Sequence, residues 1–514
     1  MSKTIIIIGA GLAGLSAALQ AAENGCNVKL VSSLPSERAQ SVMAEGGINA
    51  ALNTKDENDS PEEHFTDTIK AACGLADPNA VWGMTQAAPE LVHWLLKLGV
   101  KFNMSGYDDV DLRNFGGQKK KRTAFAQSDT GKQIMTAMID AVRRKEASGM
   151  VERFSHHSFL TLRLCSNICC GCVIRDEYSQ ETVELPGDAV IVATGGMHGL
   201  FGNTTGSLSN TGEVTAELFR LGVPLANGEM IQYHPTTVKC GGKRMLISEA
   251  ARGEGGRLFA MKDGKQWYFM EEKYPELGNL MPRDITAREI WKVSHESEVF
   301  LDMTEISEEI ISNKLSGLAD DCMTYLHKDI RKEPVSVLPG IHYFMGGILV
   351  DEQHRTPVQN LYAAGECCAQ YHGANRLGGN SLLGALYGGR VAAKSACEQA
   401  DVVDLSCATQ IDFPPASQIS EIKQLNKVMQ ETMGVVRNEN TLLNGIQTVQ
   451  ALTGNLPLLG MAVLKSALAR KESRGAHWRE DYPKSNDNDY LKTTVARFDG
   501  KQIQISFVPV PERR

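Results

Sequence analysis

A chain of 514 residues, 42% of them hydrophobic and 22% charged, is too long for a single hydrophobic core and too apolar to be disordered. Two or three domains are therefore expected. A net charge of −8 argues against a nucleic-acid-binding protein, because phosphate binding needs a concentrated excess of Lys and Arg. The compact basic run at 119–122 is typical of a solvated loop.

Cysteine usage and the first residues predict a reducing, cytoplasmic location. The twelve cysteines lack the spacing of a secreted disulfide framework, and no charged segment precedes a cleavable apolar core. The segment Ile5 to Ala22 is as apolar as a membrane helix, but its three glycines and β-branched opening favour a buried strand, turn and helix. No direct membrane span is therefore expected.

The first elements form a predicted βαβ unit. Ile5 to Ile8 and Val28 to Val31 have the composition of buried parallel strands, and Leu15 to Glu23 has helical spacing. In this context glycines predict a dinucleotide site, because they allow a tight turn and bring pyrophosphate to the helix N-terminus. The turn has the spacing GxGxxG, with Gly9, Gly11 and Gly14.

Further elements extend this site. The acid expected at the end of the second strand is replaced by Ser32, so a hydroxyl is predicted to bind the ribose. Thr194-Gly195 and Gly365-Glu366 each follow another strand-like segment. Together the three glycine elements predict a large cofactor with two parts.

The rest of the chain predicts an interrupted α/β fold. Helical spacing dominates Ala80 to Leu98 and Gln133 to Lys145, whereas Phe159 to Val192 is rich in strands. Residues 236–338 show a different pattern of loops and helical spacing. At Leu361 a short apolar strand followed by glycine appears again, as in the first part of the chain. The predicted organisation is a Rossmann-like cofactor-binding domain at 1–235 and 339–405, interrupted by an inserted α+β domain at 236–338 and followed by a C-terminal helical domain and tail at 406–514.

Seven longer motifs occur in one order along the chain. They are Ala-Glu-Gly-Gly at 44–47, Phe-Gly-Gly at 115–117, Tyr-His-Pro-Thr at 233–236, Arg-Gly-Glu-Gly-Gly at 252–256, His-Tyr-Phe-Met-Gly-Gly at 342–347, His-Gly-Ala-Asn-Arg-Leu-Gly-Gly-Asn-Ser-Leu at 372–382, and Ser-Arg-Gly-Ala-His at 473–477. With them the chain resembles the flavoprotein subunits of succinate dehydrogenase and fumarate reductase, from Ile5 to about Leu491. The resemblance implies an FAD-binding domain, a capping domain inserted into it, and an active site between cap and flavin.

The resemblance also implies how a four-carbon dicarboxylate is bound. His234 and Ser248 would hold one carboxylate, His342 and Arg376 the other, and Phe115 would cover the olefin. The family usually has Thr where Ser248 stands, but the hydroxyl is kept. Such donors are what a dianion needs when it leaves water, and Arg suits planar, bidentate binding.

The reaction implied is reduction of fumarate to succinate, by hydride transfer from FAD N5 and protonation by an arginine. The proton donor would be Arg283, recharged through Glu249 and Arg252. Free guanidinium is normally always charged, so this role requires a strongly basic acceptor and a proton relay. The alternative for Arg283 and Glu249 is a structural ion pair.

The implied FAD contacts include one departure from the family. Members of membrane complexes usually link FAD covalently to a His, and Gln40 stands at that position here. An amide cannot form this link, so noncovalent FAD is expected, with a lower flavin potential that favours fumarate reduction over succinate oxidation. The contacts are Gly9, Gly11, Gly14, Ser32, Ala44, Gly46, Gly47, Thr194, Gly195, Glu213, Glu366, Ser381 and Leu382; no metal ligand is expected.

Other functions remain open. L-aspartate oxidase shares the motifs but generally has Glu where Phe115 stands, and succinate dehydrogenase would run the same chemistry in the oxidative direction. A reductase of another unsaturated acid and a flavin-binding subunit without turnover are further alternatives.

The cysteines at 165, 169, 170 and 172 match no standard zinc or ferredoxin spacing. The resemblance therefore implies a separate iron-sulfur partner subunit, and a membrane anchor through it.

Overall fold

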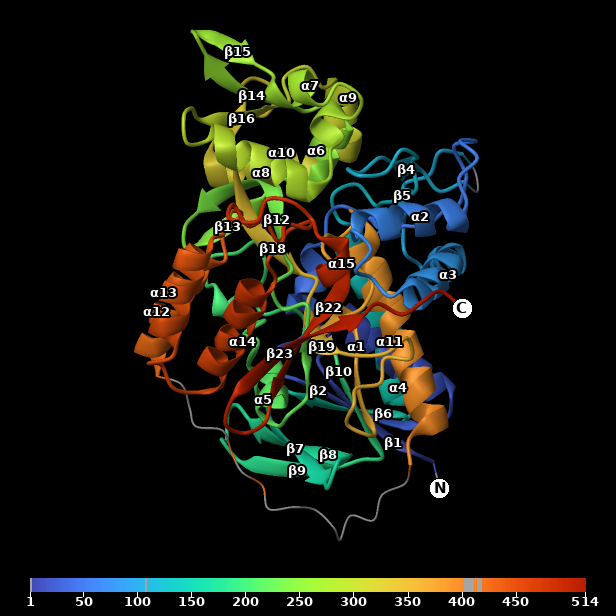
Figure 1. Ribbon diagram of the computed structural model, residues 1–514. Coiled ribbons are helices and arrows are strands. Elements are labelled where there is room, and N and C mark those ends of the chain that lie inside the picture. Colours follow the sequence, from blue (N-terminus) through green and yellow to red (C-terminus); the bar gives the residue numbers. More distant parts are fainter. Residues whose placement is uncertain (1, 107–108, 402–410, 412, 414–417) are drawn as a thin grey trace.

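The computed structural model describes residues 2–106, 109–401, 411, 413 and 418–514, and its centre is a parallel sheet (Figure 1). Ile5 to Ile8 are at most 3% exposed, which explains their unbroken apolar character, because both faces of the sheet are covered. The strand order is β20 (Leu361–Ala363), β10 (Ala189–Val192), β1 (Thr4–Ile8), β2 (Asn27–Ser32) and β6 (Val151–Ser155).

The two faces of this sheet are covered by different layers. Ile5 and Ile7 pack with the helices α1 (Leu12–Glu23), α4 (Thr130–Ala147) and α11 (Asn380–Gln399). Ile6 and Ile8 pack with an antiparallel sheet of β7 (His157–Cys165), β8 (Ile168–Asp176) and β9 (Thr182–Pro186). The predicted βαβ unit and the predicted strand-rich segment are both confirmed.

Helix α1 begins at Leu12, three residues before the predicted start at Leu15. The turn ends at Gly11, and Gly14 already lies in the first helical turn. A Cβ on Gly14 would lie 1.8 Å from the carbonyl oxygen of Gly9. Glycine at this position therefore allows the helix to start directly against the end of the strand, where sequence reasoning expected a longer turn.

A second body, with its own core, stands above the sheet in Figure 1. Two strands, β12 (Ile231–Cys240) and β18 (Leu338–Phe344), connect it to the rest and pair with each other. Its other elements are β13 (Lys243–Leu246), α6 (Glu249–Gly253), β14 (Arg257–Lys262), β15 (Lys265–Trp267), α7 (Phe269–Lys273), η4 (Gly278–Leu280), α8 (Arg283–Val293), β16 (Val299–Asp302), α9 (Glu308–Lys314), α10 (Ser316–Asp321), η5 (Cys322–Leu326) and β17 (Val335–Ser336). We refer to residues 236–338 as the cap, keeping the predicted bounds.

The C-terminal part combines a helical layer with a hairpin. The helices α12 (Ile419–Thr432), α13 (Glu439–Val449) and α14 (Asn455–Ala469) share one core. The predicted boundary between 405 and 406 lies outside the described residues. After the short helix α15 (Asp487–Tyr490), the hairpin of β22 (Lys492–Phe498) and β23 (Ile503–Pro509) completes a sheet with β11 (Leu225–Ala226), β19 (Gly347–Leu349) and β21 (Cys368–Ala369).

Short elements connect these layers. They are η1 (Ser36–Arg38), η2 (Gln40–Met43), β3 (Ile48–Asn49), α2 (Pro61–Ala71), α3 (Pro78–Lys97), β4 (Leu112–Arg113), β5 (Thr123–Ala124), η3 (His198–Leu200), α5 (Glu213–Arg220) and η6 (Gly365–Cys367). Across the described part of the chain, every helix is too short or too polar to cross a membrane.

Candidate active site

A cavity of about 660 Å³ lies where the carboxyl ends of the central strands face the cap. The turn after β1, the end of β2 and the N-terminus of α11 line one side, and β12, β18 and the start of α6 line the other. Most of the predicted site residues meet in this cavity: Gly9, Gly11, Ser32, Gln40, Ala44, Gly46, Gly47, Phe115, Thr194, Gly195, Glu213, His234, Ser248, Glu249, Arg283, His342, Glu366, Arg376, Ser381 and Leu382. Gly14 and Arg252 are not among its lining residues.

The first side of the cavity fits a dinucleotide. Gly9 has a φ of +111°, and a Cβ there would lie 2.2 Å from the carbonyl oxygen of Ala193, so only glycine is accommodated. The first turn of α11 has no capping side chain among the described residues, which leaves backbone N–H groups for an anion. The Oγ of Ser32 is buried and finds no partner in the described part of the chain, as expected of a group that binds a ribose hydroxyl.

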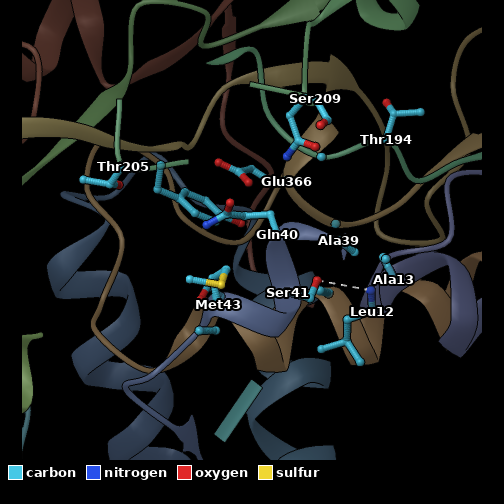
Figure 2. Close-up of a pocket in the computed structure, with 18 of the residues that line it drawn as sticks. Leu12, Ala13, Ala39, Gln40, Ser41, Met43, Thr194, Thr205, Ser209 and Glu366 are labelled. Carbon is cyan, nitrogen blue, oxygen red and sulfur yellow. Dashed lines mark hydrogen bonds between the residues drawn. The ribbon is translucent and has the colours of Figure 1, made fainter. Parts of the chain in front are cut away.

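The short helix η2 closes this side of the cavity (Figure 2). The Oγ of Ser41 accepts a hydrogen bond of 3.2 Å from the N–H of Leu12, which joins η2 to the start of α1. Gln40 and Met43, from the same helix, also line the cavity. Glu366, from η6, also lines the cavity and accepts a hydrogen bond of 3.0 Å from the N–H of Phe344.

The two predicted histidines come from paired strands of the other side. His234 lies on β12 and His342 on β18, with ring centroids 5.1 Å apart. The Nδ1 of His342 lies 2.8 Å from the Oγ1 of Thr205. Burial, and then the charge of Arg283, holds the pKa of both rings well below the usual value. Both imidazoles are therefore neutral at neutral pH, and each can donate one N–H to a carboxylate.

The predicted relay is a contiguous set of buried ion pairs. Oε2 of Glu249 accepts from the Nε and Nη2 of Arg283, at 2.8 and 2.5 Å, and Oε1 accepts from the Nη2 of Arg252 at 3.3 Å. Burial would raise the pKa of Glu249, but the two guanidinium groups outweigh it and the pKa is lowered. Glu249 is therefore held as a carboxylate between two arginines, with Arg252 on the side away from the cavity.

Arg376 is a buried cation with few protein partners. Its side chain is 3% exposed, its Nε has no hydrogen-bond partner among the described residues, and its Nη1 makes a long contact of 3.4 Å to the carbonyl oxygen of Leu377. The guanidinium lies 4.5 Å above the ring of Tyr343. Burial lowers the pKa of Arg376 to about 9. A buried guanidinium with so few hydrogen-bond partners is suited to bind the carboxylate of a ligand.

Phe115 joins the cap to the cofactor side. It is 2% exposed and packs in the apolar core of the cap. Cβ atoms on Gly46 and Gly378 would lie 2.7 and 2.9 Å from its ring, so both glycines admit this side chain. The phenyl ring gives this wall of the cavity an apolar surface with no charge.

Sequence reasoning missed two residues that line the cavity, Tyr343 and Glu45, and one that supports it from behind the wall, Gln232. Tyr343 supports Arg376, and Gln232 accepts a hydrogen bond of 3.1 Å from the Nη1 of Arg283. Glu45 lines the cavity, and burial raises the pKa of its carboxyl to about 8. Tyr343 and Glu45 stand inside motifs that the sequence displays, so the motifs gave a signal for both. Gln232 comes one residue before its motif and gave none.

The cysteine run lies far from this chemistry. Cys169 and Cys172 are fully buried on β8, in the apolar core that also contains Ile174 and Leu185. Burial raises the pKa of Cys169 to about 12, which keeps it a thiol. The described part of the chain contains no cluster of His, Cys, Asp and Glu that could hold a metal ion.

Fold and cavity together define an FAD-binding flavoprotein, and comparisons with known proteins support this. The chain matches the family "FAD binding domain" over residues 4–382 and "Fumarate reductase flavoprotein C-term" over residues 452–513. It is 37% identical to the succinate dehydrogenase flavoprotein subunit of Bacillus subtilis, covering 100% of this chain and 98% of the relative. It is 32% identical to the 8-methylmenaquinol:fumarate reductase flavoprotein subunit of Wolinella succinogenes, covering 100% and 92%.

Solved structures give the same relationship. E. coli quinol fumarate reductase FrdA, in a mutant form, has a TM-score of 0.90 at 27% identity, covering 99% of this chain and 97% of that one. Mycobacterium smegmatis Sdh1 has a TM-score of 0.84 at 29% identity, covering 100% and 95%. The chain belongs to the family of succinate dehydrogenase and fumarate reductase flavoprotein subunits, which are FAD-dependent oxidoreductases.

Proposed function

We propose that the protein is the FAD-bearing catalytic subunit of a fumarate reductase. The observation that carries the proposal is Arg376, a buried guanidinium in the same cavity as neutral His234 and His342. A dianion with a carboxylate at each end supplies the negatively charged partner that the guanidinium of Arg376 needs. Burial makes the pairing strong, because an unpaired cation in a low-dielectric site is costly.

Two groups of donors divide the substrate between them. His234 and the hydroxyl of Ser248 hold one carboxylate, while His342 and Arg376 hold the other. Ser248 is the N-cap residue of α6, where its Oγ accepts a hydrogen bond of 3.4 Å from the N–H of Ala250, so its O–H can still donate to the carboxylate. Donors fixed before the substrate arrives stabilise charge that develops on a carboxylate in the transition state more than they stabilise the ground state.

Arg283 protonates the substrate carbon in this proposal. When bound, FAD supplies the hydride that reduces the olefin. Glu249 holds Arg283 by two hydrogen bonds to a single oxygen, which fixes the guanidinium at the cavity wall. Glu249 also contacts Arg252, which does not line the cavity, so the three side chains form a path from the cavity into the cap along which the proton is replaced.

The proposal includes noncovalent binding of FAD and a preference for reducing fumarate over oxidising succinate. Gln40 lines the cavity in the position where the family's covalent link would require a His. Without that link the flavin potential is expected to be lower, and for a two-electron couple about 30 mV corresponds to about 1.4 kcal/mol. Electron transfer to fumarate is favoured accordingly, and electron transfer from succinate is disfavoured.

Electrons must enter from a partner. The relatives described above are named as subunits, which supports an assembly. We propose an iron-sulfur subunit as the electron donor, and through it a membrane anchor at the cytoplasmic face.

Two other activities are tested alongside. The Bacillus subtilis relative is named a succinate dehydrogenase, which favours the oxidative direction as the second candidate. L-aspartate oxidase is the third, and the phenyl ring of Phe115 argues against it, because a substrate ammonium group would find no carboxylate there.

Stopped-flow spectroscopy distinguishes these activities. Dithionite-reduced protein should be reoxidised by fumarate in the absence of oxygen, and oxidised protein should be reduced slowly by succinate and not by L-aspartate. The Arg376→Ala variant should retain FAD and lose the response to fumarate. Succinate oxidation as fast as fumarate reduction would overturn the direction, and rapid flavin reduction by L-aspartate would overturn the function.

A further inference from the structure

Two cysteines from distant parts of the chain meet behind the central sheet. Cys26 lies between α1 and β2, and Cys397 lies in the last turn of α11. Their Sγ atoms are 2.9 Å apart, closer than two sulfurs sit in ordinary packing. A disulfide has an S–S distance of about 2.05 Å, so bond formation needs an approach of about 0.9 Å.

The pair is accessible from one side. Cys26 is 5% exposed, whereas Cys397 is partly exposed. A surface hollow lined by Gln20, Asn24, Lys394, Cys397 and Glu398 leads to the second sulfur. Neither cysteine lines the cofactor cavity. A small oxidant can therefore reach Cys397 without entering the active site.

We propose that Cys26 and Cys397 form a reversible disulfide when the protein meets a peroxide. The sulfur of Cys397 attacks a peroxide oxygen and becomes a sulfenic acid, and the released hydroxide takes the thiol proton to give water. The thiol of Cys26 then attacks the sulfenic sulfur, and a second water leaves as the S–S bond forms. Two thiols lose two electrons in total, and one hydrogen peroxide is reduced to two waters.

The surroundings predict a slow oxidation that speeds up with pH. Burial, and then the neighbouring sulfur of Cys26, raises the pKa of the Cys397 thiol, while the charge of Lys3 lowers it. The Nζ of Lys3 donates a hydrogen bond of 2.8 Å to the carbonyl oxygen of Cys397. The thiolate is the reacting form, so its fraction and the rate rise with pH.

The bond would brace the cofactor site from behind. Helix α1 begins at the glycine turn after β1, and α11 begins beside Ser381 and Leu382, all of which line the cavity. The two helices pack against each other in one core. A covalent link between Cys26 and Cys397, 371 residues apart, would close a long loop of the chain and constrain its unfolded state. The folded pocket that holds FAD would therefore resist thermal unfolding, and FAD would be released at a higher temperature.

Peptide mapping of the FAD-loaded protein tests the proposal. The protein is treated with hydrogen peroxide, its remaining thiols are alkylated, and it is digested without reductant for mass spectrometry. We expect a linked pair of peptides containing Cys26 and Cys397, lighter by two hydrogen atoms than the separate peptides and separated by dithiothreitol. The link should be absent from the Cys26→Ser and Cys397→Ser variants. It should persist in Cys73→Ser, which removes another partly exposed thiol.

A second measurement reports the bracing. Flavin fluorescence during heating should show FAD release at a higher temperature after peroxide treatment in the wild type, and no such shift in Cys397→Ser. Oxidation of Cys397 to a sulfinic or sulfonic acid with Cys26 unmodified would overturn the disulfide. So would a link to a different cysteine, or full retention of both thiols while Cys73 reacts. A disulfide without any shift in FAD release would overturn the bracing.

Discussion

Arg283 donates two hydrogen bonds to one oxygen of Glu249, from Nε at 2.8 Å and from Nη2 at 2.5 Å. The contact uses one edge of the guanidinium and leaves Nη1, which donates to Oε1 of Gln232 at 3.1 Å. Gln232 in turn donates 2.8 Å to the carbonyl oxygen of Arg376. The proposed proton donor and the proposed carboxylate clamp are therefore held in one hydrogen-bonded network.

The first prediction concerns Arg283. Arg283→Lys should retain FAD and fumarate binding but lower turnover about 100-fold or more, because a lysine cannot keep both the position and the pKa of the guanidinium. Single-turnover reoxidation of the reduced flavin measures the chemical step. Arg288→Lys, on the same helix but outside the cavity, is the matched control and should react normally. Near-normal turnover in Arg283→Lys would mean that another group supplies the proton.

Phe115→Glu should weaken fumarate binding about tenfold or more. The new carboxylate would lie in the cavity near the substrate dianion and beside Glu249, and like charges repel strongly when desolvated. Titration of the flavin spectrum with fumarate gives the dissociation constant. Phe115→Gln has a similar volume without the charge and should lose less affinity; equal losses in the two variants would show that shape alone is responsible.

Tyr343 is expected to orient Arg376 through its ring. Tyr343→Leu should weaken dicarboxylate binding about 2- to 30-fold, the range of a cation–π contact worth about 0.5–2 kcal/mol. Tyr343→Phe keeps the ring and should bind nearly as well as the wild type. A KM that rises in the Leu variant, with kcat and FAD content little changed, supports a positioning role. Equal behaviour of the Leu and Phe variants would exclude the ring as the support.

FAD should leave the protein on acid precipitation. Gln40 carries no nucleophilic imidazole, so all the flavin is expected in the supernatant, where its absorbance can be measured. The Gln40→Ala variant should behave in the same way, since the side chain forms no bond to the cofactor in either protein. Flavin fluorescence that stays with the precipitated chain in a denaturing gel would contradict this expectation.

Glu45 should make stability depend on pH. Burial, and then the nearby charge of Asp321, raises the pKa of Glu45 from 4.5 to about 8. The folded protein therefore binds this proton more tightly than the unfolded chain does, and the free energy of unfolding falls as pH rises from about 4.5 through about 8. In Glu45→Gln this contribution is absent. Thermal midpoints of wild type and variant should diverge in favour of the variant as pH rises from about 4.5 to about 8. Parallel curves would rule Glu45 out as the group responsible.

Much of the central fold could be predicted because short stretches of sequence determine its strands and turns. The run Ile5 to Ile8 is apolar at every position, which indicates a strand buried on both faces, and the glycine spacing after it indicates the turn. The start of α1 was wrong by three residues, because Gly14 is helical for a reason of packing, its contact with Gly9, that spacing alone does not reveal. Strand β22 was missed, since its pairing with β11 joins residues far apart in sequence.

The site could be predicted only as far as motifs reach. His234 and His342 were each visible in a motif, and the pairing of β12 with β18 brings them within 5.1 Å. The sequence could not show that Gln232 bridges Arg283 and Arg376, because that contact depends on how a strand of the connection to the cap faces the helix α8 and the loop before α11. The meeting of Cys26 and Cys397 has the same origin, the packing of α1 on α11.

The hairpin of β22 and β23 is synthesised last among the strands of its sheet, which affects when that sheet can be completed. It joins the sheet of β11, β19 and β21 by pairing with β11, and β19 and β21 follow the cavity-lining residues Tyr343 and Glu366 in sequence. Strand β11 is made long before its partner β22, so during synthesis its edge stays unpaired until residues 492–498 have been made. No residue of the hairpin lines the cavity, so the late partner of β11 closes the edge of a sheet without adding to the cofactor pocket.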